Sequence, residues 1–254
     1  FFFAHLGFSQ NFQFIEYGIE DGIAQNFIYS MDQDAKGYLW IGTGEGLCKY
    51  DGQNFETFTS KDGLAEDVVT STFIGSDNVL WMGHNNGSIS RLENGRFSTF
   101  QDNNQVISTI NEVSLIRDKV FFVSQNEGLF TLSSGKYKKV GTFGASRFYA
   151  FQHIDEENIV LGTDIGLIHL VKKNQKWVKK KSLLQGKQVI AVIQSKLNRN
   201  LFATTNDGIL CQLKFSGGNL MIRQWNADYL DGVEIRSVMQ DDQMNVWLGT
   251  TEKG

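Results

Sequence analysis

The stretch Tyr38-Leu39-Trp40-Ile41-Gly42-Thr43-Gly44-Glu45-Gly46-Leu47 recurs, with variation, five more times along the chain. The second glycine of the successive copies falls at positions 46, 87, 128, 166, 208 and 254. Neighbouring copies are therefore 38 to 46 residues apart. Six copies at this spacing indicate a repeat protein, in which each unit buries its apolar face against the next.

Each period is typical of four short β-strands. In the first period, residues 26–32 alternate and residues 38–42 are more continuously apolar, which suggests burial on both faces. Residues 47–50 and 55–58 follow, separated by a turn rich in Asp, Asn and Gly. No stretch has a sustained apolar period of 3.6, so we expect few helices. This pattern predicts an all-β fold, a β-propeller of four-stranded blades.

We expect about six blades in residues 10–254, which form an incomplete propeller. Residues 12–17 followed by Asp21-Gly22 parallel residues 55–58 followed by Asp62-Gly63. They predict the outer strand of a blade whose inner strands lie beyond Gly254. A seven-bladed ring at about 41 residues per blade needs on the order of 285–290 residues, so we expect seven blades in the complete ring. An unclosed ring should aggregate or oligomerise through its exposed strand edges.

The first nine residues differ from the repeats. The apolar run that begins at Phe1 is followed by the small residues Gly7 and Ser9, which is typical of the end of a secretory signal peptide. We therefore interpret residues 1–9 as a signal-peptide remnant, with a strand as the alternative. This interpretation predicts an extracytoplasmic protein.

Composition excludes several classes of protein. The chain has 254 residues, 41% of them hydrophobic and 20% charged, with a net charge of −4. This balance excludes disorder, and no apolar run is long enough for a polytopic membrane protein. Cys48 and Cys211 fall at related strand positions of different repeats, so we expect neither a disulfide nor a zinc knuckle.

Charge is distributed unevenly along the chain. Residues 1–127 carry 17 acidic and 7 basic residues, whereas residues 128–254 carry 11 acidic and 17 basic residues. Six of those bases are lysines between positions 172 and 181. We interpret this run as a solvated face, with a patch for an anionic glycan or nucleic acid as the alternative. An isoelectric point near 5.6 argues against a dedicated nucleic-acid binder.

The repeats resemble the two-component-regulator propeller family. The family pattern is an aspartate and a glycine, then Leu-Trp-Ile-Gly-Thr, then Gly-Leu and a Tyr-Asp-Gly turn. Residues 34–52 match it best, and residues 241–250 match nearly as well. In the third and fifth copies, the sequence alignment places Ser124 and Thr204 at the first glycine and puts Phe122 and Phe202 at the tryptophan.

The resemblance implies the extracytoplasmic sensor region of a bacterial receptor. Such propellers are commonly followed by a second propeller or a β-sandwich, then by a membrane helix and a histidine kinase or other output domain. The resemblance therefore implies these neighbours as partners and a periplasmic location. It implies no nucleic-acid partner.

Most chemistry-bearing residues have structural explanations. Trp40, Trp81 and Trp247 recur at one strand position, and we expect them to pack between blades. The loop 42–46 has no lysine and no following helix, unlike a phosphate-binding loop. The aspartate turns offer too few oxygens for calcium, and the four histidines lack metal spacing. We expect no metal, no cofactor and no catalytic residue.

The candidate ligand-binding residues lie in the turns between second and third strands and in the connections between blades. Propeller connectivity places both sets on one face, where rigid scaffolds carry their binding groups. The candidates are Glu45, His84, Asn85, Asn86, Gln125, Asn126, Arg147, Asp164, Asn206 and Asp207.

We therefore expect a ligand-sensing propeller that binds a small molecule, a glycan or a protein on this face. One alternative is a secreted propeller lyase or glycosidase, which needs two facing carboxylates about 5–10 Å apart. Another is a purely structural protein-interaction module.

Overall fold

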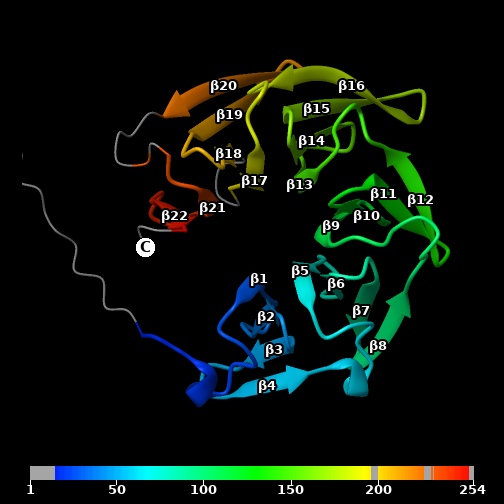
Figure 1. Cartoon of the computed structure of the whole chain (residues 1–254), viewed down its shortest axis with the longest axis vertical. Helices are drawn as coiled ribbons and strands as arrows, with labels where there is room; N and C mark the ends of the chain where they lie inside the picture. Colours follow the sequence, from blue (N-terminus) through cyan, green and yellow to red (C-terminus); the bar gives the residue numbers. More distant parts are fainter. Residues whose placement is uncertain (1–14, 196–199, 226–229, 231, 252–254) are drawn as a thin grey trace, which may run out of the picture.

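The computed structural model describes residues 15–195, 200–225, 230 and 232–251. Five four-stranded antiparallel sheets and one two-stranded sheet follow one another around a central axis (Figure 1). We number these sheets blades 1 to 6. The predicted all-β fold of four-stranded blades is therefore confirmed.

Within each blade the strands pair in chain order, and the first strand lies nearest the axis (Figure 1). Blade 1 contains β1 (Ile28–Gln33), β2 (Leu39–Thr43), β3 (Gly46–Tyr50) and β4 (Phe55–Phe58). Blade 2 contains β5 (Val69–Ile74), β6 (Leu80–His84), β7 (Ile89–Glu93) and β8 (Arg96–Phe100). Blade 3 contains β9 (Ile110–Ile116), β10 (Lys119–Ser124), β11 (Gly128–Ser133) and β12 (Lys136–Gly141).

Blade 4 contains β13 (Phe148–His153), β14 (Asn158–Thr163), β15 (Gly166–Lys173) and β16 (Lys176–Leu183). Blade 5 contains β17 (Val189–Gln194), β18 (Leu201–Thr205), β19 (Leu210–Ser216) and β20 (Asn219–Trp225). Blade 6 contains β21 (Ile235–Gln240) and β22 (Val246–Thr250). Two single 3-10 turns, η1 (Ile19–Asp21) and η2 (Ser60–Asp62), precede blades 1 and 2.

The core lies between blades. Trp40 and Leu47 of blade 1 pack with Val69 and Met82 of blade 2. Trp81 packs in the same way against residues of blade 3. Both tryptophans are 8% exposed, so their predicted role in packing between blades is confirmed.

The first glycine of the motif is required by this packing. A Cβ on Gly42 would lie 2.5 Å from Ser30 Oγ and 2.7 Å from the carbonyl oxygen of Val69, the first residue of the next inner strand. A Cβ on Gly83 would lie 2.5 Å from Ile110 Cγ2 in blade 3. The glycine therefore allows each blade to approach the next.

Blade 3 corrects the sequence alignment. In blade 1, Thr43 and Gly42 pair with Ile28 and Ser30 across the inner bulge. The same places in blade 3 are taken by Ser124, opposite Ile110, and by Val123, opposite Glu112. Ser124 thus replaces the threonine of the motif and not its first glycine.

The turn between the second and third strands of blade 3 has one residue more than the same turn of blade 1, and this extra residue causes the shift. Because strand faces alternate, the shift by one residue turns Phe121 toward blade 4 and Phe122 toward blade 2. Phe121, not Phe122, therefore stands at the tryptophan position.

The N-terminal predictions fall mostly outside the described residues. The signal-peptide remnant, residues 1–9, lies there, as does Gly254. Of the strand expected over residues 12–17, residues 15–17 are described and are not in a strand. The described residues contain no helix long and apolar enough to cross a membrane.

Candidate functional site: the loop face

The candidate residues lie on one face of the ring. The strands of each blade are antiparallel and pair in chain order. The turn from the second to the third strand and the connection to the next blade therefore lie at the same end of the sheet. We call this surface the loop face.

The threonine of the motif builds each turn. Thr43 Oγ1 donates to the carbonyl oxygen of Gly46 at 2.8 Å and accepts the Glu45 N–H at 3.1 Å. Thr163 makes the same two contacts, with Gly166 and Ile165. Both threonines are fully buried. The side chain of Glu45, at the tip of the first turn, is exposed.

The turns of blades 2 and 3 are tied to the connections beside them. Asn85 Oδ1 accepts a hydrogen bond from Thr109 Oγ1, in the connection to blade 3, at 2.8 Å. Asn86 Oδ1 accepts the Ser88 N–H and hydroxyl at 3.0 and 2.6 Å. The Gln125 carbonyl oxygen accepts the Phe148 N–H of blade 4 at 2.9 Å. Asn85 and Gln125 therefore contribute to contacts between blades.

Blades 4 and 5 present the charged candidates. Asp164 Oδ1 accepts the Ser146 N–H at 3.1 Å, and its own N–H donates to the Arg147 carbonyl oxygen at 3.2 Å. The Asn206 N–H donates to the Gln188 carbonyl oxygen at 3.1 Å. The side chains of Asn126 and Arg147 are exposed.

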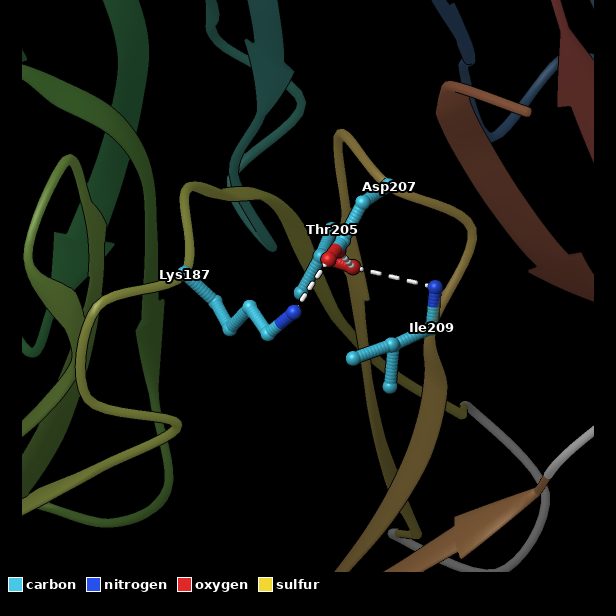
Figure 2. Close-up of polar contacts among 4 residues, drawn as sticks. All are labelled: Lys187, Thr205, Asp207 and Ile209. Carbon is cyan, nitrogen blue, oxygen red and sulfur yellow. Dashed lines mark hydrogen bonds and ion pairs between the residues drawn. The ribbon is translucent and has the colours of Figure 1, made fainter. Parts of the chain in front are cut away.

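Asp207 is the centre of a small polar cluster, drawn in Figure 2. Its carboxylate forms an ion pair with Lys187 and accepts the Thr205 hydroxyl at 2.6 Å. Thr205 Oγ1 in turn accepts the Ile209 N–H at 3.0 Å. Burial pushes the pKa of Asp207 upward, but the hydrogen bonds from Lys187 and Thr205 outweigh it and hold the pKa below its usual value.

His84 corrects one expectation. It is the last residue of β6, not a loop residue, and it is fully buried. One ring nitrogen lies 2.7 Å from Ser90 Oγ and the other 3.2 Å from the Val68 carbonyl oxygen. Burial lowers the pKa of His84 to about 4, so the ring is neutral at pH 7. It occupies the position of the turn threonine and has a structural role.

Sequence reasoning missed the partners of these residues. Glu127 accepts hydrogen bonds from Ser108 and Ser124 on the loop face of blade 3. Lys187 and Thr109 lie in the connections between blades, where the repeat has no fixed residue. The only feature of the sequence that pointed to Glu127 was the extra length of the turn in which it lies.

Two carboxylates on inner strands are relevant to the alternative of a lyase or glycosidase, which needs two facing carboxylates. Glu112 of β9 accepts the Phe151 N–H of blade 4 at 2.6 Å, and Asp32 of β1 accepts the Thr72 hydroxyl of blade 2 at 2.8 Å. Burial raises the pKa of Glu112 to about 8, against the lowering effect of the Phe151 hydrogen bond, and the charge of Asp32 adds to the rise. Each carboxylate joins two blades, which gives both a structural role.

The aspartate turns on the opposite face are also accounted for. Asp34 Oδ1 accepts the Lys36 and Tyr38 N–H groups, and Oδ2 accepts the Trp40 indole N–H at 3.0 Å. Asp241 and Trp247 repeat that contact at 2.8 Å. Within the described residues, no three His, Cys, Asp or Glu side chains group as metal ligands, and Cys48 and Cys211 are free thiols.

Comparison with known families agrees with this blade architecture. Residues 22–45, which span β1, β2 and the first turn of the loop face, match the family described as "Two component regulator propeller". Blade 1 carries a two-component regulator propeller repeat. A 50-residue stretch is also 38% identical to histidine kinase P4 of Formosa agariphila; it covers 20% of this chain and 4% of that protein.

Solved propellers share the fold. One is the extracellular domain of a hybrid two-component system from B. thetaiotaomicron, with a TM-score of 0.69 and 18% identity over 93% of this chain. The chain spans 40% of that domain. Another is virginiamycin B lyase from Staphylococcus aureus in an inactive form, with a TM-score of 0.73 and 13% identity over 95% of this chain and 83% of the lyase. The same fold thus occurs in a two-component system and in a lyase, so the fold alone does not define the function.

Proposed function

We propose that this propeller is the extracytoplasmic ligand-sensing region of a bacterial two-component receptor. It binds a small molecule, glycan or protein on the loop face and has no catalytic role itself. The match of residues 22–45 to the two-component regulator propeller repeat carries the proposal. Its neighbours are a further propeller or β-sandwich and a membrane-anchored output domain.

The loop face suits a sensor because its turns are linked from blade to blade. Asn85 and Gln125 connect blade 2 to blade 3 and blade 3 to blade 4. A ligand that contacts several turns stabilises one arrangement of neighbouring blades. It shifts the receptor only as far as it prefers that arrangement.

Three exposed candidates test the proposal with little risk to the fold: Glu45, Asn126 and Arg147. Thermal unfolding is followed with libraries of oligosaccharides, amino acids and peptides. A compound that raises the unfolding temperature should lose its effect in the triple variant Glu45→Gln, Asn126→Ala and Arg147→Ala.

A matched triple variant on the opposite face is the control: Gln53→Ala, Lys36→Gln and Arg96→Ala. It should respond like the unmodified protein. If the compounds that bind are unaffected by the loop-face variant, or lose their effect in the opposite-face variant, the loop face is not the sensing surface.

A further inference from the structure

A groove of about 880 Å³ lies at the rim of the ring between blades 3 and 4. Residues of β12 and β16, the outer strands of these two blades, line its sides, and both strands lie on the outside of the ring (Figure 1). Part of its wall comes from residues 116–119 and Glu156, at the turns opposite the loop face. The groove is therefore separate from the candidate residues above.

The groove is basic although the chain as a whole is acidic. Six bases and two acids line it, whereas the whole chain has a net charge of −4. The acids are Asp118 and Glu156, and Glu156 is paired with Arg117. Within the described part of the chain no ion pair neutralises the other five bases, which are exposed: Lys119, Lys138, Lys139, Lys172 and Lys176.

Aromatic rings form part of the lining. Trp177 is partly buried and meets Phe121 edge to face, with ring centroids 6.1 Å apart. Both rings line the groove. An indole held in this way offers a rigid apolar surface beside the positive charges.

The basic surface also extends beyond this groove. A second hollow of about 440 Å³ lies against the same β15–β16 hairpin and shares Lys172 with the first. Lys173, Lys179 and Lys180 line it. Glu157 lines it too, and the ammonium groups of Lys179 and Lys180 donate to the carbonyl oxygens of Phe143 and Gly218. Lysines outnumber acids in both hollows, and a series of positive charges over two hollows suits a chain of several anions better than one compact anion.

We propose that the rim groove between blades 3 and 4 binds a polyanionic saccharide, a sugar chain that carries carboxylate or sulfate groups. The lysines contact the anionic groups, and Trp177 packs against the apolar face of a sugar ring. A nucleic acid fits less well, because such sites favour arginine forks and several aromatic rings for successive bases. Here the one arginine is paired with Glu156.

Binding of polygalacturonate and of dextran sulfate to the 254-residue chain tests the proposal, by titration calorimetry in low salt. Neutral dextran controls for the sugar backbone, and oligothymidylate, whose charge lies on phosphodiesters, controls for an anionic chain that is not a polysaccharide. The groove variant is Lys138→Gln, Lys139→Gln and Lys176→Gln. Its matched control removes three exposed lysines elsewhere: Lys36→Gln, Lys61→Gln and Lys214→Gln.

We expect at least one polyanionic saccharide to bind, more weakly as salt is added. The groove variant should bind it about tenfold more weakly, whereas the control variant should change it less than threefold. Trp177→Phe keeps an aromatic ring at that position and should abolish the change in tryptophan fluorescence on binding.

Three results would overturn the proposal. The first is no binding of either polyanionic saccharide in low salt. The second is an equal loss in the groove and control variants, which would mean attraction to the overall charge. The third is that oligothymidylate binds as tightly as the saccharides with the same loss in the groove variant, which would identify a nucleic-acid site. All three are distinct from a failure of the loop-face sensor, which concerns other residues.

Discussion

Blades 1 and 2 each bury a tryptophan at the same strand position, but the hydrogen bonding of its indole N–H differs between them. Trp40 donates its indole N–H to Asp34 at 3.0 Å. Trp81 is equally buried, at 8% exposure, yet its indole N–H has no hydrogen-bond partner among the described residues, because Gly75 stands where blade 1 has the aspartate. Blade 6 resembles blade 1, because Trp247 donates its indole N–H to Asp241.

The difference shows what the aspartate of the repeat does. One carboxylate closes the turn between the first and second strands and also satisfies the indole, so it couples a local turn to the core between blades. In blade 2 the turn is closed by Asp77, which accepts the Val79 N–H at 3.2 Å. Turn formation and core packing are therefore separable.

The largest expected effect comes from removing the carboxylate of blade 1. Asp34→Ala leaves three donors without their partner: the Lys36 and Tyr38 N–H groups and the Trp40 indole. We expect a loss of about 2–3 kcal/mol in the free energy of unfolding, measured with urea. Asp77→Ala is the matched control and should cost about 0.5–1 kcal/mol. Equal losses would mean that the indole contact adds nothing.

The tryptophans themselves give a smaller, direct comparison. Trp40→Phe and Trp81→Phe remove the same volume from equally buried sites. Trp40→Phe also removes a charge-assisted hydrogen bond, whereas Trp81→Phe removes a buried N–H that has no partner. We expect Trp40→Phe to be more destabilising by about 1–2 kcal/mol in urea unfolding. The opposite order would contradict this account of blade 2.

A gain should follow from giving blade 2 the turn of blade 1. Gly75→Asp alone would bring its Cβ within 2.5 Å of Asp77 Oδ1, so the variant must be Gly75→Asp with Asp77→Lys. The new carboxylate then reaches the indole of Trp81. We expect stabilisation of about 1 kcal/mol, measured by urea unfolding. The control is the same double change in Trp81→Phe, which should gain less.

The smallest effect is a pH dependence in blade 6. The hydrogen bond from Trp247 is the largest cause that holds the pKa of Asp241 below its usual value of 3.8. The ionised carboxylate therefore stabilises the native state above this value, and the contribution is lost as pH falls through the lowered pKa.

Trp247→Phe should accordingly reduce the thermal unfolding temperature more at pH 6 than at pH 3. Trp81→Phe, which has no carboxylate partner, should show no such difference. A pH-independent effect of Trp247→Phe would argue against an ionic contact in blade 6.

The sequence by itself determined the fold class, because the same pattern of strands and turns occurs six times. Apolar strands at a spacing of about 40 residues, each followed by a glycine turn, can bury their faces only against one another. The packing role of Trp40 and Trp81 followed from the same repetition. So did the presence of the loop face, which strand connectivity alone requires.

The tertiary structure decided which polar residues of that face have structural partners. His84 occupied a turn position in the sequence, but the fold buries it against Ser90. The shift at Ser124 was not visible in the sequence, because the added turn residue leaves the spacing of the repeat glycines unchanged. It nevertheless reverses the face of the sheet toward which each side chain of the strand points.

Long-range contacts explain what the sequence could not predict. Lys187, in the connection between blades 4 and 5, pairs with Asp207 in a turn of blade 5, and residues of β12 and β16 from neighbouring blades line the rim groove. These groupings join residues about 20 to 40 positions apart. No repeat pattern specifies these pairs, since they lie in the positions that vary between copies. The run of lysines was visible in the sequence, but only the packing of blade 3 against blade 4 makes it the wall of a groove.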